Sequence, residues 1–307
     1  MVARLNRVPG VLLVAIAAAL WGLDPILRKP LAASTSATTI VFGEHVVLVA
    51  FTLPLLLPAL RAMSKAGPRY IAGSMMVGGG ASAIATILFT DALFHSDFIT
   101  PVVLQKVQPL VAVMGAAVVL RERPRPRFAW FLAAALAGLW LVNQAHPLDP
   151  TAKGLRPVVE SLAAAVLWAS GTVLGRYLGK ELEFQHIYSL RFFFGLIASA
   201  LALPVMNAKA YAGAHDSLWI AYYAIATGLV SLALYYYGLK RTPAVLASLA
   251  ELTYPAIAVL GGIYAYHSHL RWSQWVGVAL IFTVVSLLPV QRRRAIVSVP
   301  QAAPSLA

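Results

Sequence analysis

The feature that most constrains this chain is a succession of apolar stretches, each about as long as a membrane is thick. The hydrocarbon core of a bilayer is about 30 Å thick and is crossed by about 20 helical residues. Short connections separate the stretches, which leaves no room for a soluble domain. The sequence therefore predicts an all-α membrane protein with ten transmembrane helices, at 10–28, 39–60, 68–94, 99–120, 126–144, 154–178, 185–206, 217–238, 243–266 and 272–290.

Composition supports a chain solvated by lipid. Hydrophobic residues make up 60% of it and charged residues only 11%, whereas about a quarter of a soluble protein is charged. The net charge of +13 would suggest nucleic-acid binding in a soluble protein. Here the basic residues lie in short loops, so we interpret them as topology signals and expect no nucleic-acid partner.

The first apolar stretch could be a signal peptide, because Arg4 and Arg7 precede it. The hydrophobic run continues to Leu27, beyond the usual length of such a segment, and comparable stretches follow it. We therefore expect it to be the first transmembrane span.

Lys and Arg are distributed unevenly between alternate loops. If the N-terminus is cytoplasmic, most of them fall on the inner side, including the run Arg292 to Arg294. This asymmetry predicts a multi-pass protein of the bacterial inner membrane with both termini in the cytoplasm, and residues 292–307 as a basic, disordered tail. Only six lie in the outer loops, namely Arg28, Lys29, Lys153, Arg156, Lys209 and Arg271.

The chain also repeats itself at a spacing near 147 residues. Trp21 corresponds to Trp168, and Pro109 to Pro255. The matches predict a five-helix repeat over residues 1–150 and a second over 151–291. Because five is odd, the second repeat must cross the membrane in the inverted sense, an arrangement typical of transporters with a site near the midplane.

These motifs resemble the drug/metabolite transporter superfamily, and in particular its EamA-type ten-helix members. The likeness rests on the early Trp of each half, on the run from Tyr235 to Lys240, on the segments 109–115 and 255–261, and on Arg121-Glu122-Arg123. The second half departs from that last motif, with Tyr266-His267-Ser268-His269 instead. In overall look the chain is most similar to the bacterial YddG amino-acid exporters, which implies export of amino acids, aromatic ones among them, by alternating access.

A substrate site is predicted from groups near the middle of the membrane. Aromatic walls with a few convergent polar groups suit an amphipathic small molecule. We expect a cavity between the halves bordered by Trp21, Gln105, Gln108, Trp168 and Tyr254, and the alternative is that these groups only join helices. The full candidate set is Trp21, Ser82, Thr86, Gln105, Lys106, Gln108, Trp168, Ser231, Tyr235, Glu251 and Tyr254.

Charged residues inside the spans are costly, at about 2.5–3.5 kcal/mol each. Their estimated depths predict two buried ion pairs, Glu44 with Lys106 and Arg191 with Glu251, while Asp24 is expected to pair with Arg28 one helical turn away. The pairs either hold helices together or, through Lys106 or Glu251, offer a charge to the substrate.

Small residues recur where helices are expected to approach closely. Gly171, Gly175 and Gly179 form a doubled GxxxG pattern, and 78–80 is a run of three glycines. Packing is one interpretation. The other is that the run 78–80 makes room for a cavity or lets its helix flex.

Enzymatic signatures are missing from the sequence. It has no cysteine, no HExxH zinc pair, no Gly-flanked Ser nucleophile and no Walker loop. We therefore expect no metal, no cofactor and no ATPase activity, although Glu44 and His45 together resemble a proton site. An intramembrane enzyme for lipid-linked substrates and a channel are the alternatives to a transporter.

Overall fold

In a computed structural model the described residues are 9–108, 110–111, 114, 128–143, 155–239, 250, 253–267 and 269–296, and these form helices, turns and no strand. Among these described residues, six helices are able to cross a membrane by length and composition: 10–33, 37–66, 68–95, 155–175, 184–205 and 214–235. Shorter apolar helices lie at 129–138, 256–266 and 272–284. The prediction of an all-helical membrane protein is confirmed.

A side-chain cap and a glycine account for the two boundaries of the second long helix. The Ser36 side chain accepts a hydrogen bond from the Thr39 N–H at 3.2 Å, which caps the next helix. That helix ends before Gly67, whose φ of 104° favours glycine. The helices of the first half are α2 (Gly10–Arg28), η1 (Lys29–Ala33), α3 (Ala37–Ala66), α4 (Pro68–Met75), η2 (Met76–Ile84), α5 (Ala85–His95), α6 (Ile99–Leu104), η3 (Gln105–Val107) and α8 (Phe128–Asn143).

The second half follows a similar order of long and interrupted helices. Its elements are α9 (Leu155–Leu178), α10 (Phe184–Val205), α11 (Ala214–Tyr223), η4 (Ala224–Val230), α12 (Ser231–Leu239), α14 (Thr253–Tyr266) and α15 (Trp272–Ile296).

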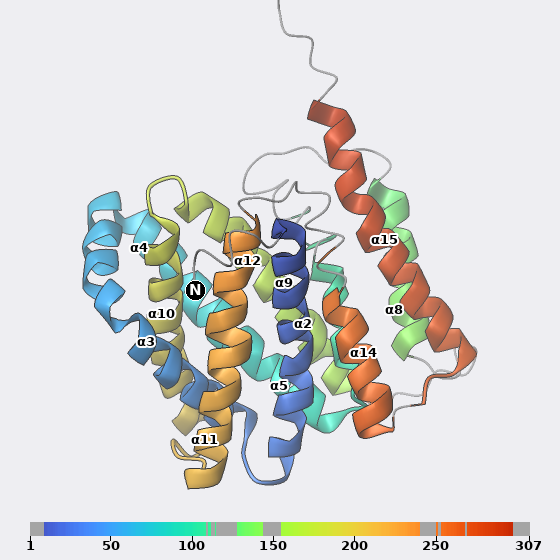
Figure 1. Ribbon diagram of the computed structural model, residues 1–307, viewed down its shortest axis with the longest axis horizontal. Helices are drawn as coiled ribbons and strands as arrows, with labels where there is room; N and C mark the ends of the chain where they lie inside the picture. Colours follow the sequence, from blue (N-terminus) through green and yellow to red (C-terminus); the bar gives the residue numbers. More distant parts are fainter. Residues whose placement is uncertain are drawn as a thin grey trace, which may run out of the picture.

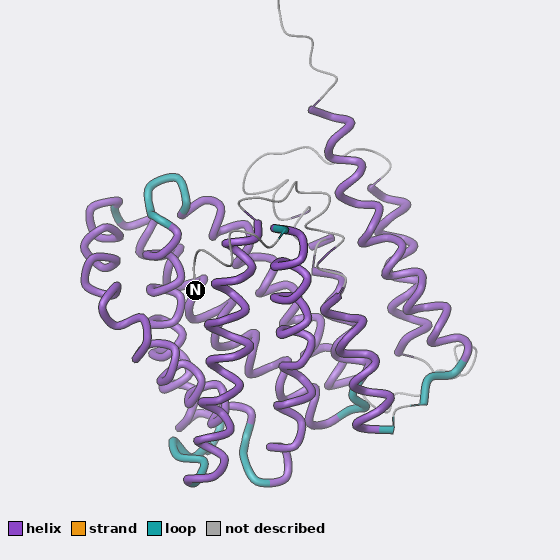
Figure 2. Tube along the Cα trace, in the orientation of Figure 1, coloured by secondary structure: helices purple, strands orange, loops and turns teal. Residues whose placement is uncertain are grey.

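Helices of the two halves pack against one another in a reciprocal way. The first helix, α2, lies against α12 and α14, whereas α9 lies against α5 and α6. The helices α3 and α10 contact each other, as do α8 and α15, which run side by side at one edge of the bundle (Figure 1). Figure 2 shows that the described loops connect helices at the two ends of the bundle. The walls of any central space therefore come from both halves.

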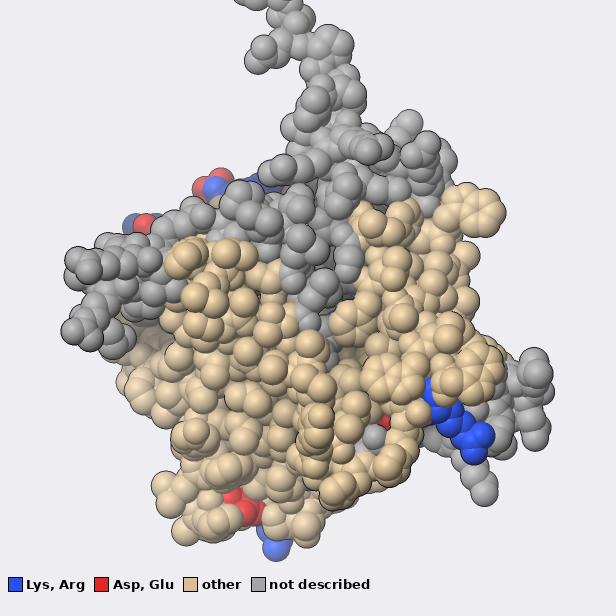
Figure 3. All heavy atoms as spheres, turned by 45° about the vertical axis from the view of Figure 1, so that its right-hand side comes forward, with Lys and Arg blue, Asp and Glu red and all other residues tan. Residues whose placement is uncertain are grey.

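The outer face of the bundle is apolar. Among the described atoms of the face in Figure 3, few belong to charged side chains. Large hydrophobic residues are exposed there and elsewhere on the outer surface, as expected for helices in contact with lipid. Examples are Phe51, Leu53, Leu57, Trp130, Leu201, Val205 and Leu218.

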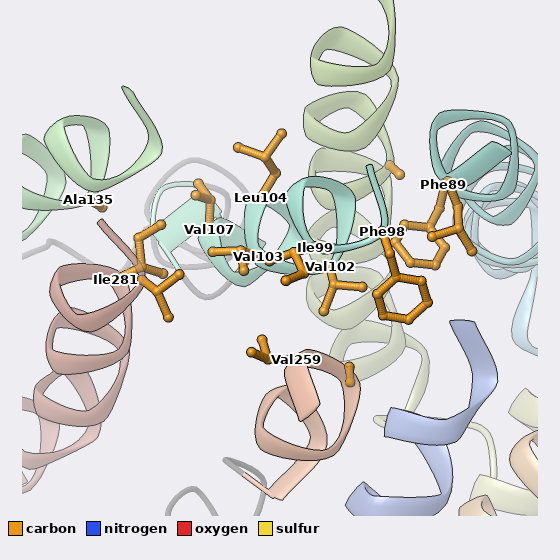
Figure 4. Packing of buried hydrophobic residues seen from close by; sticks show 14 of the residues in the cluster. Phe89, Phe98, Ile99, Val102, Val103, Leu104, Val107, Ala135, Val259 and Ile281 are labelled. Atoms are coloured by element: carbon orange, nitrogen blue, oxygen red, sulfur yellow. The ribbon is translucent and has the colours of Figure 1, made fainter. Parts of the chain in front are cut away.

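The largest hydrophobic cluster surrounds the short helix α6. Residues from α5, α8, α9 and α14 contact it, so α6 is held on several sides (Figure 4). Because η3 follows α6 directly, this packing fixes where the polar residues of η3 point.

A π-helical segment interrupts the third long helix of each half. It is η2 in the first half and η4 in the second, both with i→i+5 hydrogen bonding, a form frequent at functional sites. Within η2, Gly78 lies so close to α10 that an added Cβ would come within 2.8 Å of the Arg191 carbonyl oxygen. Gly80 has room, because its Cβ would lie 3.8 Å from Leu167. Packing is thus the role that the structure supports for Gly78.

These two glycines form a matched pair for a stability test. Gly78→Ala should lower the free energy of unfolding by about 1–3 kcal/mol, because η2 or α10 must move to admit the methyl group. Gly80→Ala should leave it unchanged or slightly raised, since alanine favours helix. Thermal unfolding in detergent measures both, and an equal effect of the two changes would contradict the close contact with α10.

Candidate functional site

A cavity of about 660 Å³ lies between the helices of the two halves. Its size falls in the range of small-molecule sites, about 300–1,000 Å³. Five of its wall residues are the ones predicted to border a central cavity: Trp21, Gln105, Gln108, Trp168 and Tyr254. They come from α2, from η3 and its C-cap, from α9 and from α14.

Tyr254 is held by two neighbours on η3. The Gln105 side-chain amide donates a hydrogen bond to the Tyr254 hydroxyl. The Lys106 ammonium lies over the Tyr254 ring, 3.5 Å from its centroid, a cation–π contact. Lys106 also lines the cavity, so a positive charge and an aromatic face meet in one wall.

The two tryptophans each contact a second aromatic ring. Tyr235 lies 5.0 Å from Trp21 between ring centroids, and Phe89 lies 5.4 Å from Trp168. Trp21 comes from the first half and Trp168 from the second. The cavity is therefore bordered by an aromatic plane from each half.

The other candidates lie elsewhere. Thr86, Ser82, Ser231 and Tyr235 are not among the cavity-lining residues, and the Ser231 hydroxyl donates to the Thr227 carbonyl oxygen within its own helix. Glu251 lies outside the described residues. The cavity also includes groups that were not proposed as substrate ligands, namely Asp24, Phe89, Phe184, Tyr188, Arg191 and Phe192.

A buried charged cluster lies beside the cavity, and its member Asp24 lines the wall. Arg28, only 3% exposed, contacts both oxygens of Asp24 at 2.9 and 3.1 Å and one oxygen of Glu44 at 2.5 Å. Three further residues surround these charges. The Thr90 hydroxyl accepts a hydrogen bond from Arg28 at 3.0 Å, Thr227 donates one to Asp24 at 3.0 Å, and the Tyr223 ring lies against the Arg28 guanidinium. We call these six residues the Arg28 cluster: Asp24, Arg28, Glu44, Thr90, Tyr223 and Thr227.

The predicted pairing of Asp24 with Arg28 is confirmed, whereas that of Glu44 with Lys106 is wrong. Glu44 binds Arg28 instead, because one guanidinium has enough donors for two carboxylates. Lys106 lies at the Tyr254 ring on another part of the bundle. Since Glu251 is outside the described residues, the pairing of Arg191 with Glu251 stays a prediction.

Further contacts join the two halves beyond the Arg28 cluster. The Ser34 and Thr35 hydroxyls donate to Asp216 at 2.6 and 2.9 Å, and Thr39 donates to the Lys209 carbonyl oxygen at 2.6 Å. The Trp219 indole donates to the Leu27 carbonyl oxygen at 2.8 Å. These hydrogen bonds hold the start of α3 and the end of α2 against residues of the second half.

The cavity extends away from the Arg28 cluster. Its wall includes Gly171 and Gly175 on α9 and reaches Phe184, the first residue of α10. A Cβ added to Gly175 would meet no atom within 4 Å, whereas one added to Gly171 would collide with Ala81. Gly171 thus serves helix packing, and Gly175 leaves open space.

Comparison with known proteins decides the family. The sequence profile described as the EamA-like transporter family matches residues 8–144 and again residues 157–289. This chain belongs to the EamA-like transporter family. It is therefore a multi-pass membrane transporter of the drug/metabolite transporter superfamily.

Individual EamA relatives differ in what their names say they carry. The chain is 29% identical over 276 residues to the riboflavin transporter ImpX of Fusobacterium nucleatum, which covers 83% of this chain and 89% of the relative. It is 27% identical over 198 residues to the pseudopaline exporter CntI of Pseudomonas aeruginosa, covering 64% and 66% of the two chains. A solved crystal structure with 18% identity covers 93% of this chain and 98% of its own with a TM-score of 0.60, which supports the fold.

The contacts within the Arg28 cluster predict which substitution of a charged residue destabilises this EamA protein most. Arg28→Met should lower the free energy of unfolding by about 3–5 kcal/mol, because it leaves two carboxylates buried without the cation between them. Glu44→Gln should cost less, since Asp24 and Arg28 then remain as a balanced pair. Thermal unfolding of the purified variants in detergent measures the difference.

Lys106 provides the control for that experiment. Adding Lys106→Met to Glu44→Gln should restore nothing, because the two side chains do not contact each other. Rescue of Glu44→Gln by Lys106→Met, or a smaller loss for Arg28→Met than for Glu44→Gln, would contradict the assignment.

Proposed function

We propose that this chain is a secondary transporter of the bacterial inner membrane that exports small amphipathic metabolites, amino acids with aromatic side chains among them, by alternating access. The observation that carries the proposal is the 660 Å³ cavity, whose wall combines Trp21, Trp168 and Tyr254 with Lys106 and Arg191. Such a wall offers stacking surfaces for a ring and positive charge for a carboxylate. The proposed role is transport and not catalysis, in line with the names of the relatives.

Several observations support a fold of ten spans in two inverted repeats. The family profile matches twice, over segments close to the predicted halves. The helix contacts are reciprocal, since α2 packs on α12 and α14 while α9 packs on α5 and α6. The π-helical segments η2 and η4 also occupy equivalent places in the two halves.

Alternating access would require one end of the cavity to close while the other opens. We propose that the Arg28 cluster closes one end. In the second half the positions equivalent to Asp24 and Arg28 carry no charge, whereas the position equivalent to Glu44 holds Arg191. At the repeat spacing of 147 residues, Asp24 and Arg28 correspond to Gly171 and Gly175. We propose that this asymmetry favours an arrangement open toward Gly175, and that the reverse arrangement forms when the Arg28 cluster separates.

The substrate class follows from the wall of the cavity. An aromatic amino acid would place its ring between Trp21 and Trp168 and its carboxylate at a basic residue. The riboflavin and pseudopaline named for the relatives are organic molecules as well, so both belong in any substrate panel.

Uptake into liposomes that contain only this protein tests the proposal. We expect saturable transport of aromatic amino acids. Trp21→Ala and Trp168→Ala should each raise KM about three- to tenfold, because one aromatic contact is worth about 0.5–1.5 kcal/mol.

Trp130→Ala is the matched control, since Trp130 is 79% exposed on the outer surface of α8 and should leave KM unchanged. Single-channel currents or flux that does not saturate would indicate a channel. Saturable transport that neither cavity tryptophan affects would show that the substrate binds elsewhere.

A further inference from the structure

A chain of hydrogen bonds runs from the cavity into the packed interior at the contact of α3, η2 and α10. Arg191, which lines the cavity, donates from Nε to the Ser82 hydroxyl at 3.3 Å. Ser82 lies 3.0 Å from Nε2 of His45, and Nδ1 of His45 lies 2.8 Å from the Val41 carbonyl oxygen. The proposed transport function gives no role to Ser82 or His45, because neither residue lines the cavity.

The direction of each hydrogen bond follows from the last acceptor. A carbonyl oxygen only accepts, so Nδ1 of His45 carries the proton and donates to Val41. In the neutral ring Nε2 then accepts from the Ser82 hydroxyl. The Ser82 oxygen, having donated its one proton, accepts from Arg191. Every link in the chain is therefore satisfied with an uncharged imidazole, as suits a residue that is 3% exposed.

The surrounding packing keeps the His45 ring in this position. Gly195 lies one turn after Arg191 on the same face of α10, and a Cβ added there would collide with the His45 ring. Ser82 is only 5% exposed and bonds residues of both α3 and α10. The chain of bonds is thus enclosed, apart from the arginine at its end.

The hydrogen bond from Nε of Arg191 to Ser82 orients the whole guanidinium group. The group is planar and rigid, so its two terminal nitrogens lie in the plane that the bond to Ser82 helps to set. Guanidinium groups held in this way bind carboxylates with two parallel hydrogen bonds. Lys106 presents only a point charge, already engaged with the Tyr254 ring.

We propose that Arg191 recognises a carboxylate of the substrate, and that Ser82 and His45 are positioning residues that hold Arg191 for this task. The inference rests on the proposed function and narrows its substrate class to aromatic carboxylates. Through Arg191 the protein discriminates aromatic carboxylates from the matching amides and amines.

Binding to the purified protein in detergent tests the proposal without requiring transport. Quenching of tryptophan fluorescence compares phenylalanine with phenylalaninamide and phenethylamine. The wild-type chain should bind phenylalanine at least about tenfold more tightly than either analogue, and Arg191→Lys should abolish this preference, because lysine has no planar pair of donors.

The positioning role is tested by substitutions of Ser82 and His45, which hold Arg191 but do not line the cavity. Ser82→Ala and His45→Leu should each weaken phenylalanine binding about tenfold, the worth of a hydrogen bond to a charged group, and leave amide binding unchanged. His45→Gln, whose side-chain oxygen can accept from Ser82, should retain the preference. A merely structural role would weaken carboxylate and amide binding alike.

The outcomes separate this inference from the proposed function. Equal binding of carboxylate and amide by the wild-type chain, no binding of any of the three, or wild-type selectivity in Ser82→Ala would overturn the inference. Selective binding without uptake into liposomes would leave it standing and overturn transport of these compounds.

Discussion

The sharing of one buried guanidinium between two carboxylates is the interaction on which the arrangement of this bundle depends. Arg28 and Asp24 come from α2, Glu44 from α3, and the Thr227 hydroxyl that binds Asp24 from η4 of the second half. In an apolar bundle a charge without a partner is costly. These helices are therefore held together at one level, where Arg28 binds both carboxylates.

The second half does not repeat the Asp24–Arg28 pair at the spacing of 147 residues. Where Asp24 and Arg28 face their partners, the positions one repeat further along the chain hold Gly171 and Gly175. Gly171 brings α9 against Ala81, and Gly175 leaves space beside the cavity. Beside the cavity, α9 thus carries two glycines where α2 carries an ion pair.

Much of the architecture could be predicted from the sequence, because a bilayer imposes helix length and excludes charge. The same reasoning identified Trp21, Trp168, Gln105, Gln108 and Tyr254, since aromatic and amide groups at mid-depth stand out in an apolar helix. All five line the cavity.

What the sequence could not provide is which helices are neighbours. Depth places Glu44 and Lys106 at similar levels, but α3 packs against α10 while η3 packs against α9. The prediction also gave each charged residue a single partner, whereas Arg28 has donors for both Asp24 and Glu44. Phe89, Tyr188 and Phe192 were missed because helices that are apolar on all sides give no periodic signal for the face that lines a cavity.

The substrate is proposed to occupy the cavity beside Gly175. Because the chain has no cysteine, a single Gly175→Cys substitution reports on that space without background. A charged, water-soluble maleimide should label this cysteine, and a saturating concentration of a transported aromatic amino acid should slow the labelling. Ser231→Cys, at a position with 0% exposure, should stay unlabelled throughout. A Gly175→Cys variant that does not react, or that reacts at the same rate with and without the substrate, would contradict the account.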